Sequence, residues 1–271
     1  EQEGFFADNG LQVEFVTVNR STDSLTLLLS GEIDVYAGTV YAGTINTISQ
    51  MDGQIKAVAD RGHTSSGGCV YQALLIRKDL FESGEITGPA DLAGLTISAQ
   101  TSGPSAHFFS TYLNQGGLSS EDIDLNYLDD PDEFVALENK AIDGCIATEP
   151  YLSIMLDSGY AEIMVKSEDV LAYQQSGVLA FGKRLLNDDR ELGVRFIAAY
   201  LQAVRQYNEG KTERNLELAS EFTGETLELL QKMCWPSLSN DGSIDFSSVD
   251  AFQQWSATND QLEFLVTEDQ F

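Results

Sequence analysis

The chain has 271 residues, 42% of them hydrophobic, and a formal net charge of -28 from 43 acidic and 15 basic side chains. This length and apolar content suffice for one large or two modest domains, and they exclude a disordered chain. The acidic excess argues against nucleic acid or anionic lipid as a partner, because both require a basic footprint. No apolar run approaches the roughly 20 residues that a membrane-spanning helix needs.

Cysteine and histidine are scarce, and their positions suggest no metal site. Cys69, Cys145 and Cys234 are widely spaced, and only His63 and His107 accompany them, so no zinc-ligand spacing occurs. We therefore expect no metal and no cofactor, and we favour three small buried thiols over a disulfide. His63 lies in DRGHTSSGG without a partner at a useful spacing, so we expect a surface-loop histidine and not a catalytic base.

The first part of the chain alternates strands with helices. A leucine-rich helical pattern ends at Gly31, and a strand over 33–37, a helix over 39–51 and a strand over 55–60 follow it. The segment ALLIRKD (73–79) is again strand-like. Strands that alternate with helices predict a mainly parallel sheet flanked by helices.

A turn-rich link over 82–94 leads to a second alternation. The predicted strands are 95–100, 124–128, 144–148 and 161–166, and the helices between them are 102–117, 132–140 and 150–159. From VLAFGKRLL (178–186) onward we predict long helices. Two separate alternations predict two α/β lobes.

The two lobes share one phrase. LLLSGEIDVYAGT (27–39) and ALENKAIDGCIATEP (136–150) each bring a helix into an Ile-Asp pair and a short strand that ends at a threonine. In open α/β sheets, ligands bind outside the carboxyl ends of the strands. We therefore expect Gly38 and Thr39 to offer backbone N–H groups and a hydroxyl to a ligand, although an ordinary turn with a helix cap is the alternative. Tyr41 is expected to stack on a ring or alkyl group of the ligand. The alternative is that its side chain only packs within the protein.

The segment TSGPSAHFF (101–109) has the features of an anion site. Gly103 permits close backbone approach and Pro104 suits the first turn of a helix, whose dipole favours an anion. We expect Thr101, Ser102, Gly103 and Ser105 to hold a sulfonate, carboxylate or phosphate. The alternative is that Ser102 only caps the helix.

Seven phrases occur in the order known from one protein family. They are EGFFADNGLQVEF, LLLSGEIDVYAGT, QIKAVAD, ALLIRKDL, DLAGLTISAQTSGPS, IDGCIATEP and WPSLSNDGSIDFSSVDAFQQW. Together they resemble the substrate-binding proteins of nitrate/sulfonate/taurine-type ABC importers. These form a branch of the type II periplasmic binding proteins that includes thiamin-pyrimidine precursor binders.

The resemblance implies an α/β, two-lobe type II periplasmic-binding-protein fold with a ligand cleft between the lobes. Lobe 1 is expected to comprise 1–80 and 176–271, and lobe 2 to comprise 81–175. Family members begin with an export signal and a first strand before the EGFF phrase, so we expect lobe 1 to lack that strand here.

The resemblance adds further candidate ligand contacts. Gly67, Gly68 and Tyr71 precede the expected lobe-crossing strand. At the return crossing lie Gln174, Gln175 and Ser176.

The second repeated strand is expected to end at another group of contacts. Thr148, Glu149 and Tyr151 lie there, and Glu149 is expected to receive an amine or ring N–H. Its alternative role is electrostatic support of the helix that follows.

The implied function is that of a monomeric, extracytoplasmic receptor. It would capture a small anionic organic or pyrimidine-like molecule and deliver it to an ABC permease, without enzymatic activity. The alternatives are an enzyme of the related thiamin-pyrimidine synthase type, whose cysteine-rich iron-binding stretch is not found here, or a ligand-sensing domain.

Overall fold

The computed structural model describes residues 1–18 and 21–271, which divide into two compact units. Unit 1 comprises Glu1–His63, Gln175–Asn215 and Ser237–Phe271, and unit 2 comprises Thr64–Gln174 and Leu216–Pro236. The first boundary lies earlier than the predicted one after residue 80. The reason is that β3 (Gln72–Arg77) pairs with two strands inside unit 2.

Unit 1 is built on a three-stranded sheet of order β1-β8-β2. Its strands are β1 (Val35–Thr39), β2 (Lys56–Ser65) and β8 (Tyr173–Phe181). Its helices are α1 (Phe5–Asp8), α2 (Ser21–Ser30), α3 (Ala42–Gln50), η3 (Arg184–Asp188), α9 (Arg190–Tyr207), α10 (Glu213–Thr223) and α12 (Phe246–Thr258). The last residues of β2, the first of β8 and most of α10 belong to unit 2.

Two local expectations for unit 1 need correction. Residues 178–181, predicted to begin the long helices, form the end of β8, because a short apolar run cannot be assigned to helix or strand by periodicity alone. The pairing of β1 with β8 is antiparallel, from Val35 opposite Phe181 to Thr39 opposite Gly177.

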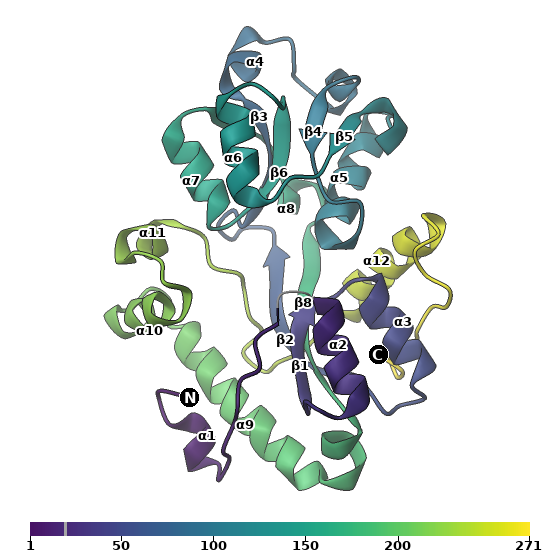
Figure 1. The fold of residues 1–271 in the computed structure, drawn as a ribbon, viewed down its shortest axis with the longest axis vertical. Coiled ribbons are helices and arrows are strands. Elements are labelled where there is room, and N and C mark those ends of the chain that lie inside the picture. Colours follow the sequence, from purple (N-terminus) through teal and green to yellow (C-terminus); the bar gives the residue numbers. More distant parts are fainter. Residues whose placement is uncertain (19–20) are drawn as a thin grey trace. The chain divides into compact units, whose positions relative to one another are not determined.

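The core of unit 1 joins helices to this sheet. Leu25 and Leu28 of α2 and Ile45 and Ile48 of α3 are buried against Tyr36 of β1. Figure 1 shows α2 beside β1, and α3 beside α2. The helical spacing of these apolar residues therefore places one face of each helix on the sheet.

Unit 2 holds a five-stranded sheet of order β5-β4-β6-β3-β7. Its strands besides β3 are β4 (Thr96–Ser98), β5 (Asp124–Asn126), β6 (Gly144–Thr148) and β7 (Ala161–Lys166). Its helices are α4 (Lys78–Ser83), η1 (Pro89–Leu92), α5 (Gly103–Gln115), η2 (Ser120–Asp122), α6 (Asp130–Glu138), α7 (Tyr151–Ser158), α8 (Ser167–Val170) and α11 (Leu227–Lys232). The α/β class is confirmed. The sheet is more mixed than expected, since β4 runs parallel to β5 and β6 whereas β3 runs antiparallel to β6 and β7.

The central strand β3 is buried on both faces of the sheet. Leu74 and Ile76 belong to a core that includes Phe108 of α5, and Leu75 belongs to a second core that includes Leu152 of α7. Successive side chains of a strand point to opposite faces, so the run QALLIR supplies both cores.

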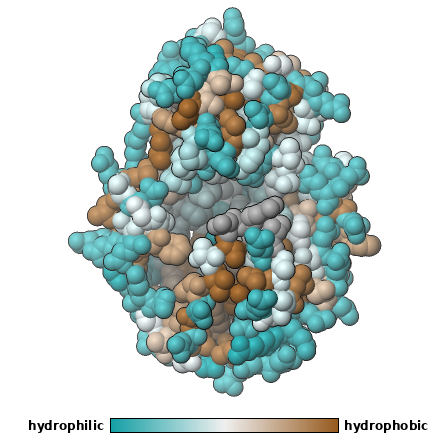
Figure 2. Space-filling model, in the orientation of Figure 1, coloured by the Kyte–Doolittle hydropathy of each residue, from teal (hydrophilic) through white to brown (hydrophobic). Residues whose placement is uncertain are grey.

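Hydrophilic residues dominate the face drawn in Figure 2, and its hydrophobic residues form smaller groups. This agrees with acidic residues that are spread along the chain. Within residues 1–18 and 21–271, no helix is long and apolar enough to cross a membrane.

Candidate functional site

One edge of the unit 2 sheet gathers several of the predicted residues. Gln72, at the start of β3, pairs with Thr148 at the end of the antiparallel β6. Because β4 runs parallel to β6, its carboxyl end and the loop to α5 reach the same edge. Polar groups from three separate segments are thus brought together there.

The N-terminus of α5 lies at this edge and leaves the Ser102 hydroxyl uncommitted to the helix. Ser102 is the extended N-cap residue, yet its side chain makes no capping hydrogen bond. Gly103 has a φ of +84°, and no heavy atom lies within 4 Å of the position that a Cβ would occupy. Thr101 and Ser102 are exposed. The helix is 13 residues long, and its dipole favours an anion at this end, where Gly103 is buried beside the exposed Thr101 and Ser102.

Two buried glutamines hold this loop, and only Gln174 is among the predicted contacts. The Gln72 Nε2 donates to Ser105 Oγ over 2.7 Å, and the Gln174 Nε2 donates to the Pro104 carbonyl over 2.9 Å. The Ser105 hydroxyl keeps its own hydrogen for another acceptor. A glutamine that opens the otherwise apolar run QALLIR is the sequence signal that could have found Gln72.

The Glu149 carboxylate accepts three hydrogen bonds from the protein itself. Its Oε1 accepts from the Cys234 backbone N–H over 2.9 Å and from the Ser153 hydroxyl over 2.8 Å, while Oε2 accepts from the Ser153 N–H over 3.1 Å. It is buried, with 9% exposure. The bond from the Ser153 N–H lies in the first turn of α7, which agrees with the alternative interpretation that Glu149 supports this helix. Thr148 and Tyr151 beside it are half-buried.

Gly68 and Tyr71 lie before β3. Gly68 belongs to an exposed turn, and the Tyr71 carbonyl accepts from the Glu149 N–H over 3.0 Å. The next residue after Gly68 is Cys69, whose Sγ is bonded to that of Cys234. The expectation of three thiols is thus wrong for this pair, because 165 residues separate the two cysteines and spacing gives no hint of their contact. Cys145 is a buried free thiol, as expected.

Two buried titratable groups lie behind the same edge. Burial raises the pKa of Glu133 to about 7, with Asp130 adding to the rise and a hydrogen bond to Ser98 opposing it. Burial lowers the pKa of His107 to about 4. Glu133 Oε2 finds no hydrogen-bond partner in the described part of the chain. Both side chains are therefore near-neutral in the fold at mildly acidic pH.

The unit 1 sheet has a matching edge, where β1 ends and β8 begins. Thr39 lies opposite Gly177, and the Val40 N–H donates to the Ser176 carbonyl over 2.9 Å. The Thr39 carbonyl already accepts from the hydroxyls of Tyr36 and Thr44, each over 3.0 Å. The predicted Thr39 and Ser176 are therefore neighbours.

The need for a glycine at position 38 is explained by packing. Tyr41 stays a candidate ligand contact. A Cβ at Gly38 would lie 2.1 Å from Cζ of Tyr36, so the aromatic ring requires a glycine there. Tyr41 precedes α3, and its buried hydroxyl has no hydrogen-bond partner among the described residues. Burial raises the pKa of this phenol well above its ordinary value.

Gln175 belongs to a buried network centred on Asp60. The Asp60 carboxylate accepts from Gln175 Nε2 over 2.6 Å, from the Ser239 N–H over 2.7 Å and from the Gly62 N–H over 2.7 Å. It also lies 2.9 Å from His63 Nδ1. Burial alone would raise the pKa of Asp60, but these hydrogen bonds outweigh it and lower that pKa.

This network changes two predictions. The Gln175 amide also donates to the Gly62 and Gly177 carbonyls, which leaves it no donor for a ligand. His63 is buried and not a surface-loop residue, because Asp60 and the backbone bridge to Ser237 hold it. Both residues are structural.

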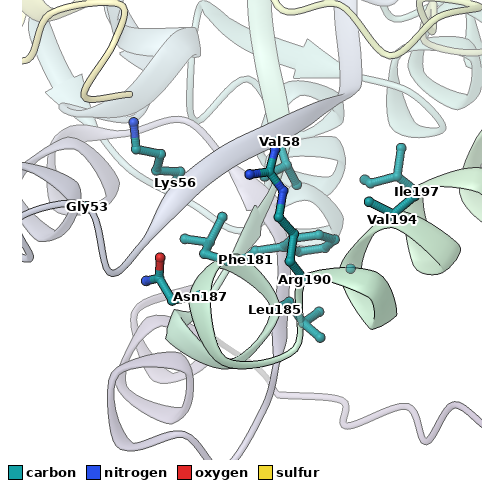
Figure 3. A pocket seen from close by; sticks show the side chains of 11 residues that line it. Gly53, Lys56, Val58, Phe181, Leu185, Asn187, Arg190, Val194 and Ile197 are labelled. Carbon is teal, nitrogen blue, oxygen red and sulfur yellow. The ribbon is translucent and has the colours of Figure 1, made fainter.

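A cavity of about 540 Å³ opens at the opposite edge of the unit 1 sheet, near Phe181 (Figure 3). Lys56, Asn187 and Arg190 bring polar groups to an otherwise largely apolar lining. Phe181 pairs with Val35 at the start of β1, so this cavity is at the far end of the strand from Thr39. None of the predicted ligand contacts lines it.

Comparison with known proteins assigns the chain to a family. A family model described as NMT1/THI5 like matches residues 1–209. The chain belongs to the NMT1/THI5-like family. No curated protein matches the chain in a sequence search.

Solved structures similar to this member of the NMT1/THI5-like family share its fold at low identity. The periplasmic aliphatic sulphonate binding protein SsuA from Escherichia coli has a TM-score of 0.78 at 17% identity, over 99% of this chain and 84% of that one. A Candida albicans protein with the generic periplasmic binding protein fold has a TM-score of 0.66 at 17% identity, over 99% and 86%. The desulfurization enzyme DSZB has a TM-score of 0.66 at 15% identity, over 99% and 90%. The predicted periplasmic-binding-protein fold is confirmed.

Proposed function

We propose that this chain is an extracytoplasmic solute-binding receptor that captures a small organic anion and delivers it to an ABC permease. Membership of the NMT1/THI5-like family and the periplasmic-binding-protein fold support this proposal. A sulfonate is the first ligand class to test, since the similar protein from Escherichia coli is a sulphonate binding protein.

One observation carries the proposal, namely the open N-terminus of α5. Ser102 is exposed and makes no capping hydrogen bond, and the space in front of Gly103 is open. Free backbone N–H groups, a helix dipole and hydroxyl groups form a site suited to a sulfonate or carboxylate. The glutamines that hold Pro104 and Ser105 keep this arrangement ready before a ligand arrives.

The disulfide supports a location outside the cytoplasm. Disulfides persist in oxidising compartments and are rare in the cytosol. The Cys69–Cys234 bond joins residues whose Cα atoms lie 5.5 Å apart, a usual separation for a structural disulfide.

Most of the other predicted contacts are retained as proposals. In unit 2 they are Thr101, Tyr71, Thr148 and Tyr151, and in unit 1 they are Thr39, Tyr41 and Ser176. Glu149 and Gln175 are left out because their polar atoms serve the fold.

Thermal-shift measurements with a panel of small molecules test the function. The panel comprises taurine, MOPS, short alkanesulfonates, the matching carboxylates and substituted pyrimidines. We expect at least one anion to raise the melting temperature and to be recovered chemically unchanged. Turnover of that anion, or no shift with any anion, would contradict the proposal.

Calorimetric titration of the Ser102→Ala/Ser105→Ala variant then tests the site. A hydrogen bond to a charged group contributes about 1.5–3 kcal/mol, so binding should weaken at least roughly tenfold. Ser120→Ala, an exposed serine elsewhere in unit 2, is the control and should bind normally. Unchanged affinity of the double variant would remove the α5 N-terminus from the site.

An enzymatic function that uses a thiol nucleophile is disfavoured by the state of Cys145. It is the free cysteine of the described residues and is fully buried at 0% exposure. Burial raises the pKa of its thiol well above the ordinary value, which suppresses the reactive thiolate.

A further inference from the structure

Residues 216–236 form a strap, a segment that belongs to unit 2 although unit 1 precedes and follows it in the chain. The disulfide attaches its Cys234 to Cys69, and the Cys234 N–H donates to Glu149 over 2.9 Å. Lys232 forms an ion pair with Asp157 of α7. Three different kinds of bond therefore hold the carboxyl-terminal part of the strap on unit 2.

The strap is internally ordered as well. Thr226 caps α11 through the Leu229 N–H, and the Ser220 hydroxyl donates to the Glu225 carbonyl over 2.7 Å across the turn between α10 and α11. Trp235 Nε1 donates to the Leu230 carbonyl over 3.1 Å, and Leu230 is 2% exposed. A segment fixed in this way presents its outer side chains in a defined geometry.

Those outer side chains include two large hydrophobic groups. Phe222, at the end of α10, is 90% exposed, and Leu227, at the start of α11, is 52% exposed. Among the described residues Phe222 is the most exposed large hydrophobic side chain, ahead of Phe15 at 63%. The ordered turn between α10 and α11 thus exposes Phe222 and Leu227, and neither belongs to a hydrophobic core of unit 1 or unit 2.

The strap carries an excess of negative charge. It contains four glutamates and a single basic residue, Lys232, which is already paired with Asp157. The glutamates are Glu217, Glu221, Glu225 and Glu228. Negative charge around the apolar pair disfavours insertion into an anionic lipid surface and favours a protein surface with Lys or Arg around an apolar pocket.

We propose that the strap is a docking surface for a protein whose apolar pocket receives Phe222 and whose basic rim pairs with Glu221 and Glu228. An aromatic side chain at the centre of a polar rim is the usual composition of such an interface. The partner that this chemistry fits under the proposed function is the membrane subunit of the importer, so the identity of the partner rests on that function. The disulfide fixes the surface before docking, which reduces the entropy lost on association.

Photo-cross-linking in intact cells that make this receptor tests the surface without knowledge of the solute. A benzoylphenylalanine replaces Phe222 in one variant and Val135 in the control, because Val135 of α6 is also in unit 2 and is 51% exposed. We expect a cross-link from position 222 to the importer membrane subunit and none from position 135. Cross-links to lipid only, to a second copy of the chain only, or of equal yield at both positions would overturn the proposal.

Binding of the receptor to the purified importer in nanodiscs measures how much the strap contributes to the affinity of docking. We expect Phe222→Ser to weaken binding at least tenfold, Val135→Ser to change it less than twofold, and Glu221→Gln/Glu228→Gln to reduce its dependence on salt. Solute affinity, measured by calorimetry on the same variants, should not change, so a failure of the receptor function is seen separately. Equal binding by Phe222→Ser and wild type would refute the docking surface.

Discussion

The buried carboxyl of Glu133 is expected to make the protein less stable as pH rises. It lies in α6 with 3% exposure, next to Ser98 and Cys145, and burial raises its pKa to about 7 from an ordinary value of 4.5. Asp130 and Asp129 also face it and add to the rise. The folded state therefore keeps a proton on Glu133 that the unfolded chain has released.

The sign and the size of the effect follow from these two values. Between pH 4.5 and 7 the folded state binds more protons than the unfolded state, so the free energy of unfolding falls with rising pH. The stability that the protonated Glu133 contributes is lost completely once the pH exceeds its pKa in the folded state. The difference between the two pKa values corresponds to about 3 kcal/mol. Glu133→Gln removes the ionisation while it keeps the shape of the side chain.

Urea unfolding curves recorded from about pH 4 to about pH 8.5 measure this effect. Glu133→Gln should resemble wild type near pH 4 and should be more stable than wild type by up to about 3 kcal/mol near pH 8. The matched control is Glu85→Gln, an exposed glutamate in the same unit, which should leave the pH profile unchanged. An identical pH dependence in wild type and Glu133→Gln would refute the reasoning.

Three further outcomes are expected. Burial lowers the pKa of His107 to about 4, so stability should fall by about 3 kcal/mol as pH drops from 6.5 to 4, and His107→Gln should flatten this acid limb in the same urea curves. Cys69→Ser/Cys234→Ser should lose about 3–5 kcal/mol of stability, because the disulfide restricts the unfolded chain, and hydrogen exchange should rise first in residues 216–236; unchanged exchange there would contradict this. The net charge of -28 should make the urea midpoint rise with sodium chloride up to about 1 M, whereas a flat response would show that self-repulsion is unimportant.

Much of the fold and part of the candidate site can be predicted from local pattern. The strands GCIAT and AEIMVK end where predicted, since Gly and Pro boundaries and β-branched runs are local signals. The segment from Thr101 to Ser105 is recognisable because Gly, Pro and Ser before an apolar helical run specify an open helix N-terminus. Which polar side chain is consumed by the fold is not predictable in the same way.

Glu149 and Gln175 show why. The place of each at a strand end predicts a ligand contact, yet each is held by groups far away in the chain, Cys234 for Glu149 and Asp60 for Gln175. The prediction of a surface His63 fails because Asp60, three residues earlier, becomes its partner only once β2 and the segment at Ser239 are packed together. Hydrogen bonds between distant segments leave no periodic trace in the sequence.

The sequence by itself determined the α/β class, the order of most strands and helices, the acidic surface and the position of the α5 N-terminus. These depend on contacts between residues close in the chain or on composition alone. Only the tertiary structure decided the mixed strand directions, the Cys69–Cys234 bond and the attachment of residues 216–236 to unit 2. The physical reason is that each of these joins segments many residues apart, whose meeting depends on how the sheets and helices pack together.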